Sequence, residues 1–434
     1  MNSKPSNPID RRRFVRASLA ASVGGVLAPA ILRGSEAPQP AKLALLHRSG
    51  RPLGWFPNVT APRILAATEG ATAILVHASN DTILQIGRRK QSLGLLTRAR
   101  MTIAPDGTMY IAGQRDRSLW LIRVTPSGKV ASTRLATLAE PHGAAGLDLV
   151  WTPDGVRIIA SGSRPQTVAL YSDVPSTPPR VLTVNAWAQP ILRYDPARRR
   201  LHLLLCPWID ASAIYSTAYY LRSDDHGETW LQADAKPYDL PLQPNSREHG
   251  LERPPPEVVT IIGQPNGGHS NTLAHCLELD PDGHPHFLYS FNRPYHLARE
   301  PFMRCVHVCW DGAKWSLDRW DGSKWKFGEL SADFAVDIAG GCLDIVNRDT
   351  LHALVMFKDR KASWLDLGIT SSRDGGRTWS PVQEVTTDAS ARAAHYITPQ
   401  WTRVGSAREF ICSGLNREPR APLYRGRIDD RRFV

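Results

Sequence analysis

The sequence predicts an all-β fold built from many small antiparallel sheets, and three observations support this prediction. Short apolar segments separated by turn residues follow one another through most of the chain. One kind of hairpin and one eight-residue motif each recur along it. Periodicity typical of helices is weak after residue 40. Recurrence of one supersecondary unit indicates a repeat architecture, in which neighbouring units bury each other's apolar faces.

The recurring hairpin consists of an Asp-Gly pair between two segments of alternating apolar residues. It occurs three times, at Asp106-Gly107, Asp154-Gly155 and Asp282-Gly283. Residues 192–204 form a variant with a longer turn. Asp-Gly in this setting is the strongest short-range indication of a β-hairpin, because glycine adopts positive φ without strain.

The eight-residue motif is Ser-x-Asp-x-Gly-x-Thr-Trp, and its two copies begin 149 residues apart. It resembles the Asp-box of sialidase-like β-propellers. The Asp accepts hydrogen bonds within the turn, the Gly takes positive φ, and the Trp packs between sheets. We therefore expect a structural role, and not a catalytic one, for the Ser, Asp, Gly and Trp of both copies: Ser223, Asp225, Gly227, Trp230, Ser372, Asp374, Gly376 and Trp379.

These repeats predict a single β-propeller domain of four-stranded antiparallel blades over residues 45–434. At about 50 to 60 residues per blade, the length predicts seven blades, with six as the alternative. Residues 31–44 are expected to form a linker. Cys206, Cys342 and Cys412 lie in predicted strands and are expected in the core.

The first thirty residues resemble a twin-arginine export signal. Arg11-Arg12-Arg13 precedes a weakly apolar stretch from Ala17 to Leu27, and Ala28-Pro29-Ala30 fits a cleavage site between small residues. The sequence therefore predicts a bacterial periplasmic or secreted protein. No apolar run reaches the roughly 18 residues that a membrane-spanning helix needs, so no membrane span is expected.

The charge of the chain favours an anionic partner. The full chain carries 53 Lys and Arg against 41 Asp and Glu, a net charge of +12. Removal of the first thirty residues leaves 48 against 40, a net charge of +8. Outside the cytoplasm, a basic balance indicates an acidic polysaccharide as partner and not nucleic acid, for which no motif is present. We expect the protein to be a monomer.

Residues 140–315 are similar to the BNR-4 repeat family, which includes secreted ulvan lyases. The similarity follows the order of several segments: His142 to Gly155, Ala188-Gln189-Pro190, Tyr219 to Trp230, Leu240-Pro241, His269-Ser270-Asn271 and Val306 to Trp315. It implies a propeller that acts on a uronate-containing polysaccharide by elimination. In such chemistry a basic cluster neutralises the carboxylate, and a His or Tyr removes the C5 proton.

The resemblance assigns roles to three positions. His142 matches the first histidine of the lyases and is the candidate acid/base residue. Arg164 falls near the second histidine of the family and can hold a carboxylate or sulfate. Gln189 stands where the family has a Tyr, and is expected to bind substrate.

Other candidate site residues follow from the blade pattern. His142, His269 and His395 each precede a predicted first strand of a blade, so they are expected at one shared pocket in the funnel. His269 is assigned a catalytic role and His395 a binding role. Asn271 lies two residues beyond His269, on the same face of the strand, and can bind a hydroxyl group.

One segment suggests a metal site. Cys305, His307 and Cys309 alternate along one predicted strand and face the same side. Residues four apart lie about 13 Å apart along a strand, so only one of these cysteines can share an ion with His307. The predicted ligands of a structural zinc are His307, either Cys305 or Cys309, and Cys276. Buried core cysteines are the competing interpretation, and the predicted chemistry requires no cofactor.

The sequence thus predicts an exported propeller that degrades an acidic polysaccharide, with a polysaccharide lyase as the first interpretation. A sialidase-like glycoside hydrolase is an alternative, for which Arg63, Arg427 and Tyr424 are candidate residues. A non-catalytic glycan-binding propeller is the other alternative, and the replacement of the family's Tyr by Gln189 favours it.

Overall fold

The structure is a computed structural model of the whole chain, which divides into two compact units, Met1–Gln39 and Pro40–Val434. All residues described below belong to the second unit. They are 44–48, 63–66, 72–77, 81–139, 146–161, 167–175, 177–184, 187–208, 217–243, 259–260, 271–292, 303–316, 330, 336–359, 362–392, 395–415 and 422–433.

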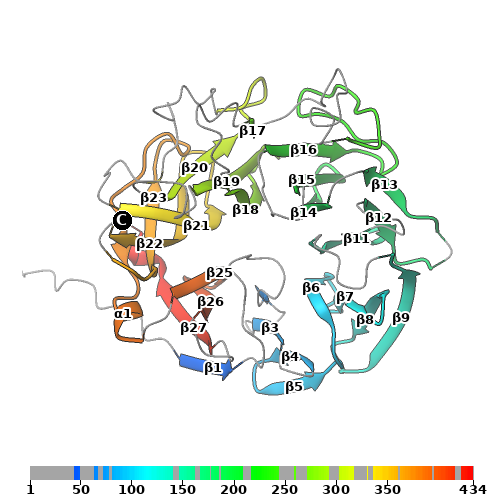
Figure 1. Cartoon of the computed structure of the whole chain (residues 1–434), viewed down its shortest axis with the longest axis horizontal. Coiled ribbons are helices and arrows are strands. Elements are labelled where there is room, and N and C mark those ends of the chain that lie inside the picture. The colour runs from blue at the N-terminus through cyan, green and yellow to red at the C-terminus, as the bar shows by residue number, and fades with distance from the viewer. Residues whose placement is uncertain are drawn as a thin grey trace, which may run out of the picture. The chain divides into compact units, whose positions relative to one another are not determined.

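The described strands form seven antiparallel sheets arranged as blades around a central axis (Figure 1). Six sheets have four strands and one has three among the described residues. In each blade the first strand lies nearest the axis and the following strands lie progressively further out. The predicted seven-bladed β-propeller is confirmed.

Blades 1 to 4 each use consecutive strands. Blade 1 contains β2 (Arg63–Ala66), β3 (Thr72–His77), β4 (Thr82–Ile86) and β5 (Arg89–Ser92). Blade 2 contains β6 (Thr97–Ile103), β7 (Met109–Arg115), β8 (Ser118–Val124) and β9 (Val130–Thr137). Blade 3 contains β10 (Asp148–Thr152), β11 (Gly155–Ser161), β12 (Val168–Ser172) and β13 (Arg180–Thr183). Blade 4 contains β14 (Trp187–Asp195), β15 (Arg200–Trp208), β16 (Thr217–Ser223) and β17 (Val259–Thr260).

Blades 5 and 6 follow the same order, and blade 7 combines both ends of the propeller. Blade 5 contains β18 (Asn271–Leu279), β19 (Pro285–Asn292) and β20 (Met303–Cys309). Blade 6 contains β21 (Val336–Ile345), β22 (Leu351–Asp359), β23 (Asp366–Ser372) and β24 (Gln383–Glu384). Blade 7 contains β25 (His395–Val404), β26 (Ala407–Leu415), β27 (Pro422–Asp429) and β1 (Ala44–Arg48). The helical elements are α1 (Ala389–Arg392) and the 3-10 turn Asp430–Arg432.

The ring is closed by the pairing of β1 with β27. These strands are antiparallel, with Ala44 opposite Arg425 and Arg48 opposite Pro422. Strand β1 is therefore the outermost strand of blade 7, although it is the first strand of the chain. This pairing joins the first strand of the chain to the last one and so closes the ring.

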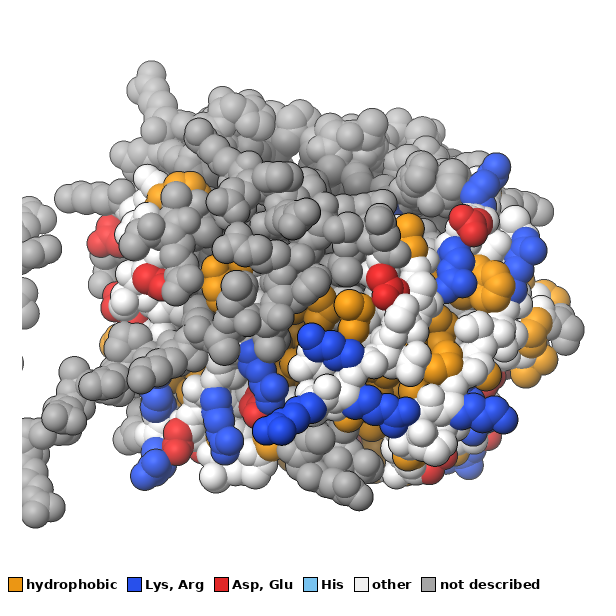
Figure 2. Space-filling view, turned by 90° about the horizontal axis from the view of Figure 1, so that it is seen from below, with side chains coloured by type: hydrophobic (Ala, Val, Ile, Leu, Met, Phe, Trp, Pro, Cys, Tyr) orange, Lys and Arg blue, Asp and Glu red, His pale blue; other side chains and the backbone are white. Residues whose placement is uncertain are grey.

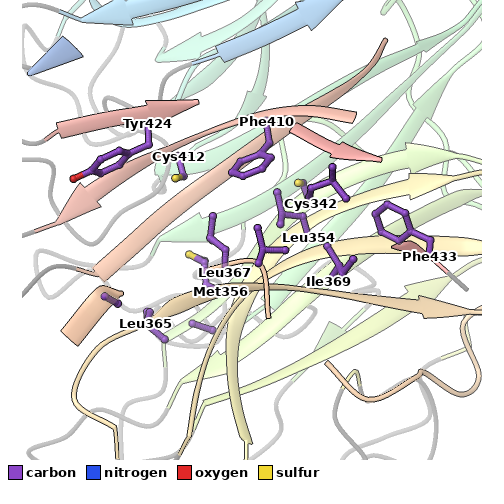
Figure 3. Close-up of a cluster of buried hydrophobic side chains, with 14 residues drawn as sticks. Cys342, Leu354, Met356, Leu365, Leu367, Ile369, Phe410, Cys412, Tyr424 and Phe433 are labelled. Carbon is purple, nitrogen blue, oxygen red and sulfur yellow. The ribbon is translucent and has the colours of Figure 1, made fainter. Parts of the chain in front are cut away.

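Apolar packing between neighbouring blades forms the core. Seven clusters of buried side chains can be traced among the described residues, one at each contact between adjacent blades. Figure 3 shows the cluster between blades 6 and 7, where Leu354 and Met356 lie opposite Phe410 and Cys412. The cluster that joins blade 7 to blade 1 includes Ile64, Ile74 and Ile411.

The burial of each strand follows its position in the blade. Strand β22 is buried on both faces over residues 351–358, because another blade packs on each side. Its apolar residues are accordingly almost continuous, as expected for a strand without a solvent face. The outer strand β9 has the opposite character, and residues 130–134 are all exposed.

The turns obey the expected glycine geometry. Gly107, Gly155 and Gly283 have φ values of 80°, 106° and 76° and connect the first and second strands of blades 2, 3 and 5. In the longer turn of blade 4, Arg199 takes the corresponding positive φ of 53°. These turns all lie at the end of the axis at which the inner strands end.

The two copies of the eight-residue motif form the same hydrogen bonds. In the second copy, Asp374 accepts hydrogen bonds from Ser372 Oγ at 2.8 Å, from the Thr378 amide at 2.9 Å and from Thr378 Oγ1 at 2.6 Å. Burial alone would raise the pKa of Asp374, but these hydrogen bonds outweigh it, so the pKa is lowered. The indole of Trp379 donates to Gly376 O and packs between blades 5 and 6. The motif thus ties a turn to the contact between two blades.

The axis has two distinguishable ends. The seven inner strands begin at one end, called the entry end below. The two Asp-box turns follow β16 and β23, so they lie at the opposite end, called the Asp-box end.

The cysteines predicted as core are buried: Cys206, Cys342 and Cys412 are 1%, 7% and 0% exposed. All six cysteines of the chain are free thiols. No helix in the described part of the chain is long and apolar enough to cross a membrane.

Replacement of Asp374 by Ala is expected to lower the free energy of unfolding by about 1–3 kcal/mol, because several turn donors lose their acceptor. The measurement is chemical denaturation. The control is Asp349→Ala, since Asp349 is exposed on a neighbouring turn of the same blade. Equal stability of the two variants would show that the motif does not stabilise the blade.

Candidate functional site

Three of the predicted site residues, His142, Arg164 and His269, lie outside the described residues. In the chain, His142 precedes β10, Arg164 follows β11, and His269 precedes β18. Each of these strand ends belongs to the entry end. The proposed roles of the three residues therefore remain predictions.

Asn271 and His395 are the first residues of β18 and β25, and their side chains also lie outside the described part. Gln189 is the third residue of β14 and is fully described. Its side chain is 5% exposed, and its Nε2 has no hydrogen-bond partner among the described residues. A buried amide without a partner is unfavourable unless a ligand or water completes its hydrogen bonds. Gln189 is thus a buried amide near the entry end whose Nε2 lacks a partner among the described residues.

A buried ion pair, formed by Asp337 and Lys358, also lies near the entry end. Asp337 follows the first residue of β21, and Lys358 lies opposite it on β22. Their charged atoms are 4.0 Å apart, and the side chains are 2% and 6% exposed. Lys358 also donates to Ala362 O at 3.3 Å. The pair is buried beside the entry end.

The inner strand of blade 2 contributes two arginines that the sequence prediction missed. Arg98 and Arg100 are 7% and 1% exposed. A β-bulge separates Thr97 from Arg100, and within it Arg98 adopts a φ of 56°. Positive φ at a non-glycine residue stores strain and is common next to functional sites.

A cavity of about 330 Å³ lies on the axis, in the half of the channel nearer the Asp-box end. All seven inner strands contribute to its wall. Its charged residues come in both signs: Asp148, Glu278 and Asp344 against Arg193, Arg403 and Arg408.

The first charge network joins three blades through Arg193. The guanidinium lies 3.0 Å from Glu278 of blade 5 and 3.7 Å from Asp148 of blade 3. Burial alone would lower the pKa of Arg193, but Glu278 and Asp148 outweigh it and raise the pKa. Asp148 also accepts a hydrogen bond from the Leu192 amide at 2.9 Å.

The second network joins blades 6 and 7 through Arg408. Its guanidinium forms ion pairs with Asp344 and Asp430 and lies 2.8 Å from His352 Nδ1. The aromatic ring of Phe433 lies 4.5 Å from the guanidinium carbon. Burial and, second, the charge of Arg408 lower the pKa of His352 to about 4, so this imidazole is neutral at pH 7.

His275 is a histidine of the cavity wall that forms no ion pair with a described residue. It sits at a β-bulge of β18, and its Nε2 lies 2.6 Å from Ser290 Oγ. The ring packs against Gly340, where a side chain of any size would clash. Burial lowers the pKa of His275 to about 4, so it is uncharged at neutral pH.

The sequence prediction did not include these axial charges, although a weak pattern was present. Single charged residues interrupt apolar inner strands near their ends, as in Leu192-Arg193-Tyr194, Leu277-Glu278-Leu279 and Leu343-Asp344-Ile345. Only the closed ring brings these positions together. Because opposite charges pair within the cavity, the network connects blades and carries no excess charge.

The predicted metal segment forms a compact group with a residue that the prediction omitted. The ligand atoms of His286, His307 and Cys309 all lie within 4.8 Å of one another. His286 Nδ1 and His307 Nε2 are 3.0 Å apart, near the about 3.3 Å between two nitrogen ligands of tetrahedral zinc. The Nε2 of His286 lies 3.7 Å from Asp280. A carboxylate behind a histidine is the usual outer partner of a zinc ligand.

The other predicted ligands lie outside this group. Cys276 is opposite Leu288, and Leu288 is opposite His307, so Cys276 is two strands away from His307. Two strand spacings amount to about 9.5 Å, which is too far for one ion. Cys305 is opposite Ser290, on the side of His307 that points away from Cys309 and His286. Among the predicted cysteines, only Cys309 lies near the histidine pair.

The chain was compared with known proteins. No family model matches it, and no curated protein matches its sequence. Among solved structures, the polysaccharide lyase Uly1 has a TM-score of 0.50 and 8% identity, covering 89% of this chain and 91% of that chain. A PL25 ulvan lyase has a TM-score of 0.47 and 11% identity, covering 86% and 79%. An α-L-arabinanase of Penicillium chrysogenum has a TM-score of 0.41 and 10% identity, covering 77% and 94%. At these identities the similarity concerns the fold alone.

Replacement of Arg408 by Met is expected to lower the free energy of unfolding by about 3–5 kcal/mol, because Asp344 is left without its buried partner. The control is Arg403→Met, which removes a second arginine from the same carboxylate. Arg403 is 47% exposed and Arg408 only 1%, so the control is expected to cost under about 1 kcal/mol. Both are measured by denaturant unfolding, and equal losses would contradict the dominance of the buried pair.

Proposed function

We propose that this protein is an exported carbohydrate-active propeller that degrades an acidic polysaccharide, acting as a lyase on a uronate-containing glycan. The observation that carries the proposal is the common direction of the inner strands. Strands β10, β14, β18 and β25 all begin at the entry end, which supports one shared mouth for His142, Gln189, Asn271 and His395.

In the proposed chemistry, each candidate residue has a separate role. Arg164 binds the carboxylate of the uronate and stabilises the charge that develops when the C5 proton leaves. His142 removes that proton, and His269 assists proton transfer to the leaving oxygen. Gln189 donates its free amide to the sugar, and Asn271 and His395 bind further hydroxyl groups. The elimination needs no cofactor.

The sialidase-like alternative is less well supported by the positions of its candidate residues. Tyr424 is 6% exposed and belongs to the apolar cluster between blades 6 and 7. Arg427 is exposed on β27, the third strand of its blade. Neither residue lies on an inner strand. Arg63, in contrast, is the first residue of the inner strand β2. Glycan binding without catalysis is supported by Gln189, since an amide binds sugar but does not transfer protons at neutral pH.

The proposed location is the periplasm or the cell exterior, reached through the twin-arginine pathway. This pathway exports folded proteins. A ring that is complete only when β1 pairs with β27 is compatible with folding before export.

The function is tested by incubating the purified protein with polyuronates and measuring ultraviolet absorbance of the unsaturated product. We expect absorbance to rise with the native protein and to be lost in His142→Ala. The control is His226→Asn, at an Asp-box turn on the opposite end, since Asn tolerates the φ of 61° there. Activity of the control should equal that of the native protein.

Two results would contradict the lyase assignment. New reducing ends without ultraviolet absorbance would indicate hydrolysis. Retention on a glycan affinity gel without any product, weakened by Gln189→Ala, would indicate a binding protein.

We further propose that His286, His307 and Cys309 hold a structural zinc ion in blade 5. The two nitrogen atoms and the sulfur are ligand types that zinc prefers, and the fourth position is left for water or another residue. Burial raises the pKa of the Cys309 thiol, and a bound zinc would hold it as thiolate. The competing interpretation is a hydrogen bond between the two imidazoles.

The zinc proposal is tested by metal analysis of purified protein. We expect about one zinc per chain in the native protein, and its loss in Cys309→Ser. The variant Cys305→Ser removes the neighbouring thiol of the same strand face and should keep its zinc. A chelator should lower the Tm of the native protein but not that of Cys309→Ser. Zinc-free native protein would overturn the proposal.

A further inference from the structure

The positive charge of the described chain is concentrated in one stretch, residues 81–139, which spans the outer part of blade 1 and the whole of blade 2. This stretch contains ten Lys and Arg but only three Asp and no Glu. It therefore carries a net charge of +7, out of +12 for the entire chain. Arg98 and Arg100 are buried near the axis, which leaves eight cations toward the surface.

Six of these surface cations form a continuous feature, which we call the basic ridge. It consists of Arg88, Arg89, Lys90, Arg123, Lys129 and Arg134, all of them exposed. Figure 2 views the molecule from the side of β5, and there Lys and Arg side chains are much more frequent than Asp and Glu.

The ridge connects two blades. Arg89, at the turn between β4 and β5, donates to Ser127 O in the turn between β8 and β9, at 3.2 Å. Lys129 follows in that same turn. Arg123 is opposite Ala131, and Arg134 is opposite Trp120, on the outer strands β8 and β9. Because side chains alternate between faces, these two arginines project from opposite faces of the outer strands, and the ridge wraps around the edge of blade 2. Three residue positions separate these two arginines along the strands, or about 10 Å.

None of the six ridge cations forms an ion pair with a described carboxylate. The charge of Arg123 contributes to the lowered pKa of Asp106, but less than the hydrogen bonds from Thr108 do. Some exposed arginines elsewhere on the surface are paired: Arg180 with Glu228, Arg199 with Asp154, and Arg431 with Asp429. Like charges held close together without counter-charges repel one another, so a bound polyanion would relieve this repulsion.

We propose that the basic ridge is a second binding surface, which holds an anionic polysaccharide on the outer wall of blades 1 and 2. Four of its six residues are arginines, whose planar guanidinium groups match carboxylates and sulfates with two parallel hydrogen bonds. A linear polyanion fits the extended course of the ridge over two turns and a strand. The surface is independent of whether the entry end is catalytic.

A lipid surface fits the ridge less well. Membrane-binding surfaces combine cations with exposed aromatic or leucine side chains that enter the bilayer. The single large exposed apolar residue within the ridge's strands is Val130, at 37%. The ridge therefore matches a hydrated polymer.

The position of the ridge decides whether a bound polymer would block the mouth at the entry end. The turns β4–β5 and β8–β9 join third to fourth strands, as the Asp-box turns do, so they lie at the Asp-box end. The ridge therefore lies away from the entry end and can retain a long chain without occupying the mouth.

The test compares two triple variants of the full-length mature protein that lose the same charge. The ridge variant is Arg88→Gln, Lys90→Gln and Lys129→Gln. The control variant is Arg180→Gln, Arg199→Gln and Arg431→Gln, which removes three exposed arginines that already have carboxylate partners. Affinity is measured by gel electrophoresis through alginate as a polyuronate, heparin as a sulfated polymer and dextran as a neutral polymer, at several salt concentrations.

We expect the ridge variant to bind the anionic polymers about tenfold or more weakly than the native protein, with a shallower salt dependence, because three fewer cations neutralise the polymer and fewer counterions are released. The control variant should change binding less than about twofold. Neither should change turnover of a short oligosaccharide. The alginate and heparin arms identify whether carboxylate or sulfate is preferred.

Three outcomes would overturn the proposal. Equal weakening in both variants would show a dependence on net charge only. Undiminished binding by the ridge variant would place the polymer elsewhere. Ridge-dependent binding to vesicles of anionic phospholipid, without binding to either acidic polymer, would identify a membrane surface instead.

Discussion

Apolar packing between adjacent sheets, repeated around a closed ring, is the constraint on which the rest of the structure depends. Each blade buries both faces of its middle strands, so each contact between blades has its own apolar cluster. A ring of such contacts needs a closing contact, which β1 and β27 provide at the outer edge and Ile64 and Ile411 provide within the core. Once the ring is closed, the seven inner strands must face one axis.

Facing one axis brings charged residues from distant parts of the chain together. Arg193 meets Glu278 and Asp148 across three blades, and Arg408 meets Asp344 across two. A buried charge is costly without a partner, so the axial charges occur in networks of opposite charge. The exposed cations of blades 1 and 2 have no such requirement, because water solvates them. The same protein therefore has paired charges on its axis and unpaired charges on its outer wall.

The predictions from sequence succeeded where the physical cause is local. Asp-Gly turns and the Ser-x-Asp-x-Gly-x-Thr-Trp motif depend on residues close in the chain, and both take the expected conformation around Gly155 and Gly376. The metal site stays a prediction, and the structure brings only part of its predicted ligand set together. Alternation along one strand correctly indicated that His307 and Cys309 share a face, but the nearest further ligand, His286, comes from the neighbouring strand. Strand register fixes that neighbour, and the sequence does not encode register in a readable way.

The sequence by itself determined the class of fold, the approximate number of blades and the turn chemistry, because periodicity and glycine conformation act over a few residues. Only the tertiary structure decided which charges meet on the axis, that Cys276 lies two strands from His307, and that the ridge cations have no partner among the described carboxylates. These features depend on distances between residues tens or hundreds of positions apart. Such distances are set by ring closure and strand pairing, and no local pattern carries them.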